Sequence, residues 1–253
     1  MPFISQRPLT LVRCPTEYSE CFYQKKLVEF SNGLYPVAIK NRNDNETENY
    51  IYLDDKEGLL SLVQMGVLEI HPWGSDINHL EYPDMMTFDL DPAPDVAWKK
   101  VVDAAFAIKQ QMDRFNLQSF VKTTGGKGLH VVVPIQPEYD WKQVKNFSHV
   151  LVQFLEKSHP AKYTSQLSKA KRKGKIFIDY LRNQRGATAI SAYSTRARIH
   201  APVATPLHWD ELTNNIKDVY YTINTLPKRL SQLKNDPWEA FGTTIQSLRL
   251  NEF

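Results

Sequence analysis

Apolar residues recur along the chain with two different periods, one typical of helices and one typical of strands. Segments 96–116 and 141–158 repeat apolar residues at helical spacing, which predicts two amphipathic helices. The first half of 59–70 has the same spacing, and its helix is expected to end near Gly66. Two more helical stretches are predicted near 208–225 and 227–234.

Strand-like segments separate these helices. Segment 119–135 (SFVKTTGGKGLHVVVPI) is predicted to form a strand, a tight glycine loop and a second strand. Such a short connection requires antiparallel pairing, so we predict a mixed sheet in an α+β or α/β chain. The most polar stretch, 41–49, is predicted to be an exposed loop. Further strands are expected in PLTLV, ECFYQ, MMTFDLD (85–91), KIFIDYL (175–181) and ATAISAYS (187–194).

Composition indicates a globular protein without a membrane span. The 253 residues are 42% hydrophobic, enough for one core or for one core with a smaller lobe. No window approaches the roughly 18 consecutive apolar residues that a membrane span requires. The N-terminal segment does not have the pattern of a secretory signal. Cys14 and Cys21 lack metal-ligand spacing, and we expect free thiols in a reducing cytoplasm.

Charge is unevenly distributed, and this is more informative than the net charge of +3. Segment 168–175 (SKAKRKGK) is strongly basic, and 182–198 adds four arginines. Acidic residues gather at 44–57 and 81–103. A basic surface close to an acidic cluster is typical of a metal-dependent enzyme with a phosphate-rich substrate.

Two carboxylates share one face of the strand predicted at 85–91. Asp89 and Asp91 are two positions apart and therefore point the same way, while Phe88 and Leu90 point into the core. Adjacent carboxylates repel each other unless a cation neutralises them, and Mg²⁺ or Mn²⁺ is suited to carboxylate oxygens. The alternative is an ordinary strand end at which Asp91 caps a turn before proline.

A third carboxylate, Asp179, lies within the apolar strand IFIDYL. An unpaired charge in such a strand would be costly, so Asp179 requires a partner. Arg182 is one candidate for this partner and a metal ion is the other. Both alternatives remain open from the residues alone.

The glycine-rich loop at 122–130 (KTTGGKGLH) offers groups that bind phosphate. Its backbone N–H groups can approach phosphate oxygens, and Thr124, Lys127 and His130 add side-chain donors. It lacks the spacing of a Walker A loop, and a strand follows it. The alternatives are a plain hairpin turn with a solvated lysine and a structural histidine.

Two other groups of residues suggest contacts with a nucleotide or a nucleic acid. Arg196 and Arg198 are expected to share a face, and their guanidinium groups suit triphosphate oxygens, although a solvated basic loop is the alternative. Phe22 and Tyr23 precede two lysines, and an aromatic ring beside a cation can stack on a base. Because adjacent strand residues face opposite ways, we expect at least one of these rings in the core.

Together these motifs resemble the polymerase domain of bacterial ATP-dependent DNA ligase D, a member of the archaeo-eukaryotic primase superfamily. The resemblance extends from RPLTLVRCP at position 7 to NDPWEAF at 235–241. Its motifs occur in the family's order: FDLDP, KTTGGKGLHVVVPI, RKGKIFIDYLRN, ATAISAYSTRAR and PLHWDEL.

The resemblance implies one primase-polymerase domain over 1–253 with an α+β fold. Residues 1–84 would form a smaller α/β unit with an end-joining loop at 39–50. Residues 85–253 would carry a mixed, largely antiparallel catalytic sheet flanked by helices, the triphosphate pocket and the C-terminal helices.

The activity that this resemblance implies is template-directed addition of ribonucleotides or deoxyribonucleotides to a DNA primer 3′ end. It would serve double-strand-break repair by non-homologous end joining and use two Mn²⁺ or Mg²⁺ ions. The implied partners are DNA with gaps or 3′ overhangs, NTP or dNTP, Ku and a DNA ligase, at the nucleoid in the cytoplasm and without a membrane.

The resemblance also assigns roles to individual positions. The catalytic, metal-binding residues would be Asp89, Asp91 and Asp179. Thr124 stands where the family usually has serine. The nucleotide would be bound by His71, Thr124, Lys127, Gly128, His130, Arg172, Arg182, Arg196 and Arg198. DNA would be bound by Arg13, Phe22, Tyr23, Lys25, Lys40 and Arg42.

Family members normally have a longer segment before RPLTL, with lysines that bind a downstream 5′-phosphate. Either the sequence is a piece of a longer chain, or the protein lacks this part of the 5′-phosphate pocket, and we expect weaker 5′-phosphate recognition here. Three alternatives to the primer-extending enzyme are a primase that starts chains de novo, a catalytically inactive DNA-end-binding module, and a nuclease that uses the same acidic cluster.

Overall fold

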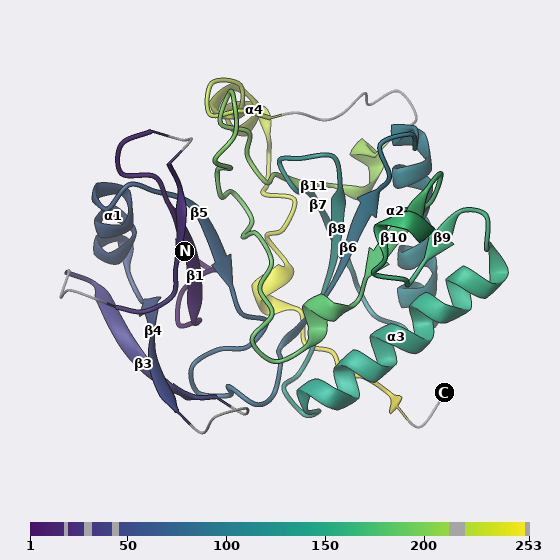
Figure 1. Ribbon diagram of the computed structural model, residues 1–253, viewed down its shortest axis with the longest axis horizontal. Coiled ribbons are helices and arrows are strands. Elements are labelled where there is room, and N and C mark those ends of the chain that lie inside the picture. Colours follow the sequence, from purple (N-terminus) through teal and green to yellow (C-terminus); the bar gives the residue numbers. More distant parts are fainter. Residues whose placement is uncertain (18–19, 28–31, 42–45, 213–220, 251–253) are drawn as a thin grey trace.

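The computed structural model describes residues 1–17, 20–27, 32–41, 46–212 and 221–250. Two β-sheets stand side by side (Figure 1). Two long helices cover the face of the larger sheet that points away from the smaller sheet. Strands and helices alternate in an α+β arrangement, as the sequence predicts.

The smaller sheet is formed by the N-terminal part of the chain. Its strand order is β2-β1-β4-β3, and β5 pairs with β1. The described pairs are antiparallel, and their inner face packs on helix α1 (Lys56–Gln64). The strands are β1 (Leu9–Arg13), β2 (Phe22–Gln24), β3 (Leu34–Lys40), β4 (Thr47–Leu53) and β5 (Val67–Pro72).

The larger sheet has the order β11-β7-β8-β6-β10-β9. The pairing of β9 with β10 is parallel and the other described pairs are antiparallel, so this sheet is mixed and largely antiparallel, as predicted. The strands are β6 (Met85–Pro92), β7 (Phe120–Thr123), β8 (Leu129–Pro134), β9 (Tyr163–Thr164), β10 (Ile176–Asp179) and β11 (Pro206–Leu207).

One face of the larger sheet is covered by α2 (Trp98–Arg114) and α3 (Trp141–Ser158), visible on the right of Figure 1. Phe88 and Leu90 of β6 are fully buried against these helices. Because strand side chains alternate, Asp89 and Asp91 project from the opposite face. That face is turned toward the smaller sheet, and the site described below lies there. The remaining elements are α4 (Leu226–Gln232), η1 (Lys169–Arg172), η2 (Leu181–Asn183), η3 (Trp209–Glu211) and η4 (Phe241–Thr243).

Three sequence-based expectations about elements are corrected. Segment 187–194 is not a strand: it forms a single bridge, between Thr188 and Trp73, and Tyr193 has a φ of 62° that interrupts extended backbone. In 208–225 the structure describes only the short η3 helix, and 213–220 lies outside the described residues. The predicted loop 41–49 includes the start of β4 at Thr47.

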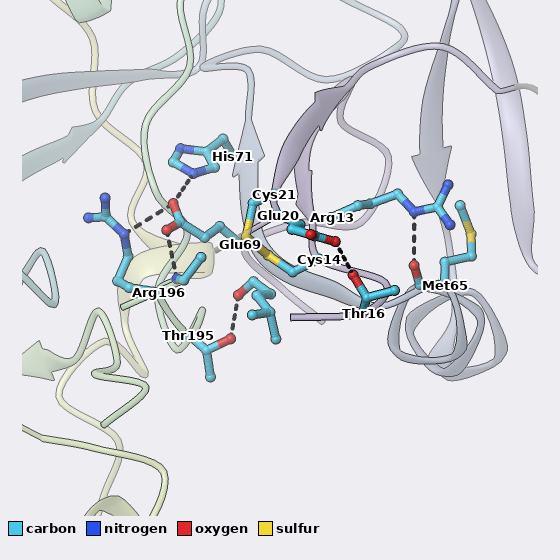
Figure 2. The surroundings of a disulfide bond; sticks show 12 residues. Arg13, Cys14, Thr16, Glu20, Cys21, Met65, Glu69, His71, Thr195 and Arg196 are labelled. Atoms are coloured by element: carbon cyan, nitrogen blue, oxygen red, sulfur yellow. Dashed lines mark hydrogen bonds and ion pairs between the residues drawn. A yellow bond between two sulfur atoms is a disulfide. The ribbon is translucent and has the colours of Figure 1, made fainter. Parts of the chain in front are cut away.

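The cysteines are also corrected. Cys14 and Cys21 form a disulfide bond instead of two free thiols (Figure 2). The pairing of β1 with β2 places Arg13 opposite Phe22, so the adjoining residues Cys14 and Cys21 also face each other. Among the described residues no helix is long and apolar enough to cross a membrane.

Residues 187–197, here called the linking segment, connect the two sheets. They follow β10 and run between the sheets as part of the green stretch in Figure 1. The Ser191 N–H donates to the Ile70 carbonyl over 2.9 Å, and the Ile70 N–H donates to Ser194 Oγ over 2.9 Å. Thr195 adds a hydrogen bond to the Leu68 carbonyl. The linking segment is therefore fastened along β5.

Candidate active site

The three aspartates lie on two neighbouring strands of the larger sheet. Asp89 on β6 and Asp179 on β10 are directly opposite each other in the antiparallel register. Asp91 is two residues further along β6, opposite Phe177. The pattern of the sequence is thus realised: two carboxylates share one strand face, and the third comes from the adjacent strand.

Two arginines are bound to these carboxylates. Arg182 approaches Asp89 at 3.1 Å and Asp179 at 3.3 Å, so Arg182 is the partner that Asp179 requires in this structure. Arg172 pairs with Asp91 at 3.0 Å. Within the described part of the chain, no group of three or more His, Cys, Asp or Glu residues is arranged to hold a metal ion.

The electrostatics of the aspartates still suit a hard cation. Burial raises the pKa of Asp91, and the neighbouring charge of Asp89 adds to this effect. Burial also raises the pKa of Asp179. Asp89 differs, because contacts with His130 and Arg182 overcome its burial and hold its pKa below the usual range. The raised pKa values mean that the bound arginines do not fully offset the effect of burial on Asp91 and Asp179, so a further cation would be favourable there. Mg²⁺ and Mn²⁺ prefer oxygen donors such as these carboxylates.

His130 on β8 faces Asp89 across the sheet. Its Nε2 lies 3.3 Å from Asp89 Oδ1. Burial lowers the pKa of His130 to about 4, so the ring is neutral at pH 7 and its Nε2–H donates to the carboxylate. His130 is therefore both a structural partner of Asp89 and a wall of the cavity described below.

The glycine loop lies close to β6. A Cβ at Gly128 would stand 2.4 Å from the Leu90 carbonyl oxygen, so only glycine allows this approach. Gly125 has a φ of 66°, which also favours glycine. Thr124 Oγ1 donates to the Gly128 carbonyl over 3.2 Å and closes the loop. The loop's backbone is thereby held beside the aspartates.

Arg196 supports the other side of this loop. Its Nη1 donates to the Thr124 carbonyl over 2.8 Å, and its Nε lies 3.1 Å from Glu69 Oε2. Glu69 in turn accepts from His71 Nε2 over 2.8 Å (Figure 2). A chain of polar contacts thus runs from β5 through the linking segment to the glycine loop.

These residues surround a cavity of about 480 Å³. Eight of the nine predicted nucleotide-binding residues line it, and Arg172 lies outside the lining. Asp89 and Asp91 are in the wall, and Asp179 is not. The full lining consists of His71, Asp89, Leu90, Asp91, Thr124, Gly126, Lys127, Gly128, His130, Arg182, Thr188, Ala189, Ile190, Arg196 and Arg198.

The predicted DNA-binding residues that the structure describes belong to the smaller sheet or to the chain directly beside it. Phe22 is 47% exposed and Tyr23 is 79% exposed, so the expectation that one ring is in the core is wrong. Strand β2 stands at the end of the strand order of its sheet, and both of these rings are exposed there. Lys25 is bound to Glu48 and to the Tyr50 hydroxyl.

The other predicted DNA-binding residues differ in their surroundings. Arg13 is bound to the Met65 carbonyl and to Gln24. Lys40 is exposed at the end of β3, and Arg42 lies outside the described residues.

The family model for the LigD primase-polymerase domain matches residues 1–238. The chain belongs to this family. It is 35% identical over 248 residues to the multifunctional non-homologous end joining protein LigD of Pseudomonas aeruginosa, covering 97% of this chain and 29% of that protein. The bifunctional LigD of Bacillus subtilis is 29% identical over 92% of this chain and 37% of its own length. The chain thus spans well under half of these relatives.

A solved structure gives the same answer for the fold. The polymerase domain of Mycobacterium tuberculosis ligase D, in complex with DNA, matches with a TM-score of 0.87 and 26% identity. The match covers 96% of this chain and 86% of that one. The primase-polymerase fold is therefore common to both.

Sequence reasoning missed part of the site of this primase-polymerase domain. Thr188, Ala189 and Ile190 line the cavity although they carry no chemical motif, because the linking segment folds across it. Glu69 was also missed, although a signal existed: Glu69 and His71 are two positions apart and share one face of β5.

Proposed function

We propose that this primase-polymerase domain is a template-directed nucleotidyltransferase. It adds nucleotides to the 3′ end of a DNA primer during double-strand-break repair by non-homologous end joining. One observation carries the proposal: Asp89 and Asp91 stand in the wall of a cavity whose other walls are a glycine loop and arginines. The family and the names of the relatives support the same conclusion.

The divalent ions would be held by Asp89, Asp91 and Asp179, with Mn²⁺ or Mg²⁺ as the expected metal. When bound, two such ions lower the pKa of the attacking hydroxyl and stabilise the leaving pyrophosphate. The ions would replace guanidinium groups as partners of the carboxylates. Arg172 and Arg182 would then be released to pair with phosphate oxygens.

The remaining residues of the cavity bind and orient the nucleotide. Backbone N–H groups of the glycine loop, together with Lys127, approach the triphosphate from one side. Arg196 and Arg198 approach it from the same side, because their side chains lie beside Gly125 and Gly126 of the loop. The primer 3′-hydroxyl oxygen attacks the α-phosphorus in line, the bond from that phosphorus to the bridging oxygen breaks, and pyrophosphate leaves.

DNA would lie across the smaller sheet. The two exposed rings of β2 suit stacking on template bases, since every base offers an aromatic face. Lys40, at the end of β3, and Arg42 would contact the DNA where broken ends meet. The proposed substrates are gapped or 3′-overhanging DNA with NTP or dNTP, and the proposed partners are Ku and a DNA ligase at the bacterial nucleoid in the cytoplasm.

The test is primer extension on a gapped duplex, with Mn²⁺ or Mg²⁺ and each of the eight ribo- and deoxyribonucleotides. Asp89→Ala is expected to lower the rate by roughly a thousandfold or more, because metal-ion stabilisation of the transition state is worth several kcal/mol. Asp103→Ala is the control, since this exposed carboxylate on α2 pairs with Lys99 and is not in the lining of the cavity.

Normal extension by Asp89→Ala would refute the mechanism. Lack of extension by the wild type, with DNA ends still bound, would instead identify an inactive end-binding module. Product on an unprimed template would identify a primase.

A further inference from the structure

Glu69 lies behind the wall of the cavity and contacts two residues of that wall. Its carboxylate accepts from His71 Nε2 over 2.8 Å and lies 3.1 Å from Arg196 Nε. The other carboxylate oxygen accepts the Ala197 N–H over 2.8 Å. Glu69 is 6% exposed, so water competes little for these contacts. Figure 2 shows the carboxylate between the imidazole and the guanidinium.

The three partners come from different parts of the fold. His71 is on β5 of the smaller sheet, like Glu69 itself, whereas Arg196 and Ala197 belong to the linking segment. Arg196 continues the chain of contacts, because its Nη1 donates to the Thr124 carbonyl of the glycine loop. One carboxylate therefore fixes the positions of two groups of the cavity wall and, through Arg196, supports the glycine loop.

The charge state of the group is well defined. Burial opposes ionisation of Glu69, but His71, Arg196 and the Ala197 N–H together lower its pKa to about 2. Burial lowers the pKa of His71, so its ring is neutral near pH 7. A carboxylate only accepts, so the ring proton is on Nε2 and Nδ1 is left as an acceptor. Glu69 thus sets the tautomer of His71 as well as its orientation.

We infer that Glu69 is a positioning residue for the incoming nucleotide: it holds His71 and Arg196 in the cavity wall and so sets nucleotide affinity more than the rate of the chemical step. The inference rests on the proposed function, because it takes the cavity as the nucleotide site. Glu69 itself is not in the lining of the cavity. The alternative is a strut that only stabilises the contact between the two sheets.

The decisive variant is Glu69→Gln, which keeps the shape and still accepts the Ala197 N–H. Its amide N–H₂ would face the donors of Arg196 and His71, so both residues lose their orientation. Hydrogen bonds to charged groups contribute about 1.5–3 kcal/mol, so the Kd for ATP is expected to rise roughly 10- to 100-fold. KM should rise by the same factor, while kcat at saturating nucleotide stays within about threefold.

The Kd is measured directly, by calorimetric titration of the full chain with ATP and Mn²⁺. This measurement separates two failures. If the wild type binds ATP but extends no primer, the proposed function fails and the role of Glu69 is still tested. A Kd for Glu69→Gln equal to that of the wild type, or a fall in kcat alone, would overturn the inference.

Glu211→Gln is the matched control for a purely structural role. Glu211 forms a comparable partly buried pair with Arg229, and neither residue lines the cavity. This variant should lose stability while its Kd for ATP is unchanged, and an equal rise in Kd would count against a special role for Glu69. If Glu69→Gln does not fold, Glu69→Asp keeps the charge but shortens the side chain by one methylene, and an unchanged Kd there would also overturn the inference.

Discussion

Single charged side chains at the site are held in surroundings that oppose their charge. Lys122 on β7 is the clearest case, with 2% exposure and, among the described residues, no hydrogen-bond partner for its Nζ. It stands opposite His130 in the strand register, on the same face as the aspartates. Burial lowers the pKa of Lys122 to about 7, although the charge of Asp89 partly offsets this. The protein thus keeps a costly cation close to its carboxylates.

Replacement of this lysine by methionine should therefore stabilise the protein at neutral pH. The folded pKa of about 7 lies below the unfolded value of 10.5, so the unfolded chain binds more protons between these pH values. The cost of burying Lys122 is full below pH 7 and disappears as pH rises toward 10.5. Urea unfolding of wild type and Lys122→Met at pH 6.5 and pH 10 would measure it. A stability gain that does not shrink with rising pH would contradict this interpretation.

For single residues, the sequence predicted those features that depend only on neighbouring positions in the chain. The two-residue spacing of Asp89 and Asp91 requires a common strand face, and the structure confirms it. The position of Arg182 between Asp89 and Asp179 was only one of two alternatives, because it depends on how β6 and β10 pair. The roles of these residues in metal binding stay predictions.

Elements at the site are positioned by close backbone approach. The glycine loop connects β7 to β8 and lies against the end of β6, where Gly128 nearly touches the Leu90 carbonyl. Leu90 stands between the two β6 aspartates, so any displacement of the loop changes the distance between the proposed phosphate donors and the carboxylates. Hairpin geometry is therefore coupled to the geometry of the cavity.

Gly128→Ala should move this loop away from β6 without unfolding the sheet. A misplacement of about 1 Å can cost roughly a hundredfold in rate, so primer extension is expected to fall by at least tenfold. Gly242→Ala is the control, because a Cβ there meets nothing within 4 Å. Circular dichroism and extension rates of both variants would decide, and equal rates would show that the close approach has no functional consequence.

The long amphipathic helices were predictable and the linking segment was not. The expected bounds 141–158 coincide with those of α3, since many apolar residues in phase specify a helix that packs on a sheet. Segment 187–194 has the composition of a strand, but its hydrogen bonds go to separate partners, such as Ile70 of β5 and Ala204, and its backbone includes a positive φ. Contacts across the fold override local preference there.

The whole molecule depends on how the two sheets are joined. Besides the linking segment, Arg7 near the start of β1 forms two hydrogen bonds with Asp84 just before β6, at 2.7 and 2.6 Å. Both side chains are largely buried. The two-part division of the domain at residue 84 stays a prediction. The contacts across it that are described above are hydrogen bonds and ion pairs.

Asp84→Asn should loosen this junction, because the arginine keeps its charge and loses the carboxylate. Breaking such a pair is expected to lower the free energy of unfolding by about 2–3 kcal/mol, near the lower limit for buried pairs. Asp103→Asn, in the exposed pair with Lys99, should change it by less than about 1 kcal/mol. Urea unfolding measures both free energies, and equal effects would show that the Arg7–Asp84 pair stabilises the protein no more than an exposed pair does.

The path of the linking segment also bears on how such domains evolve. Glu69 and His71 are encoded in the first third of the chain, whereas Arg196 and Thr124 are encoded later, yet all four meet at one cavity. Recombination between two distant relatives could exchange the N-terminal part alone. The residue at position 69 would then come from one relative and the residue at position 196 from the other, although the two had not evolved together. The two parts must therefore be inherited together, or substitutions in one must be compensated in the other.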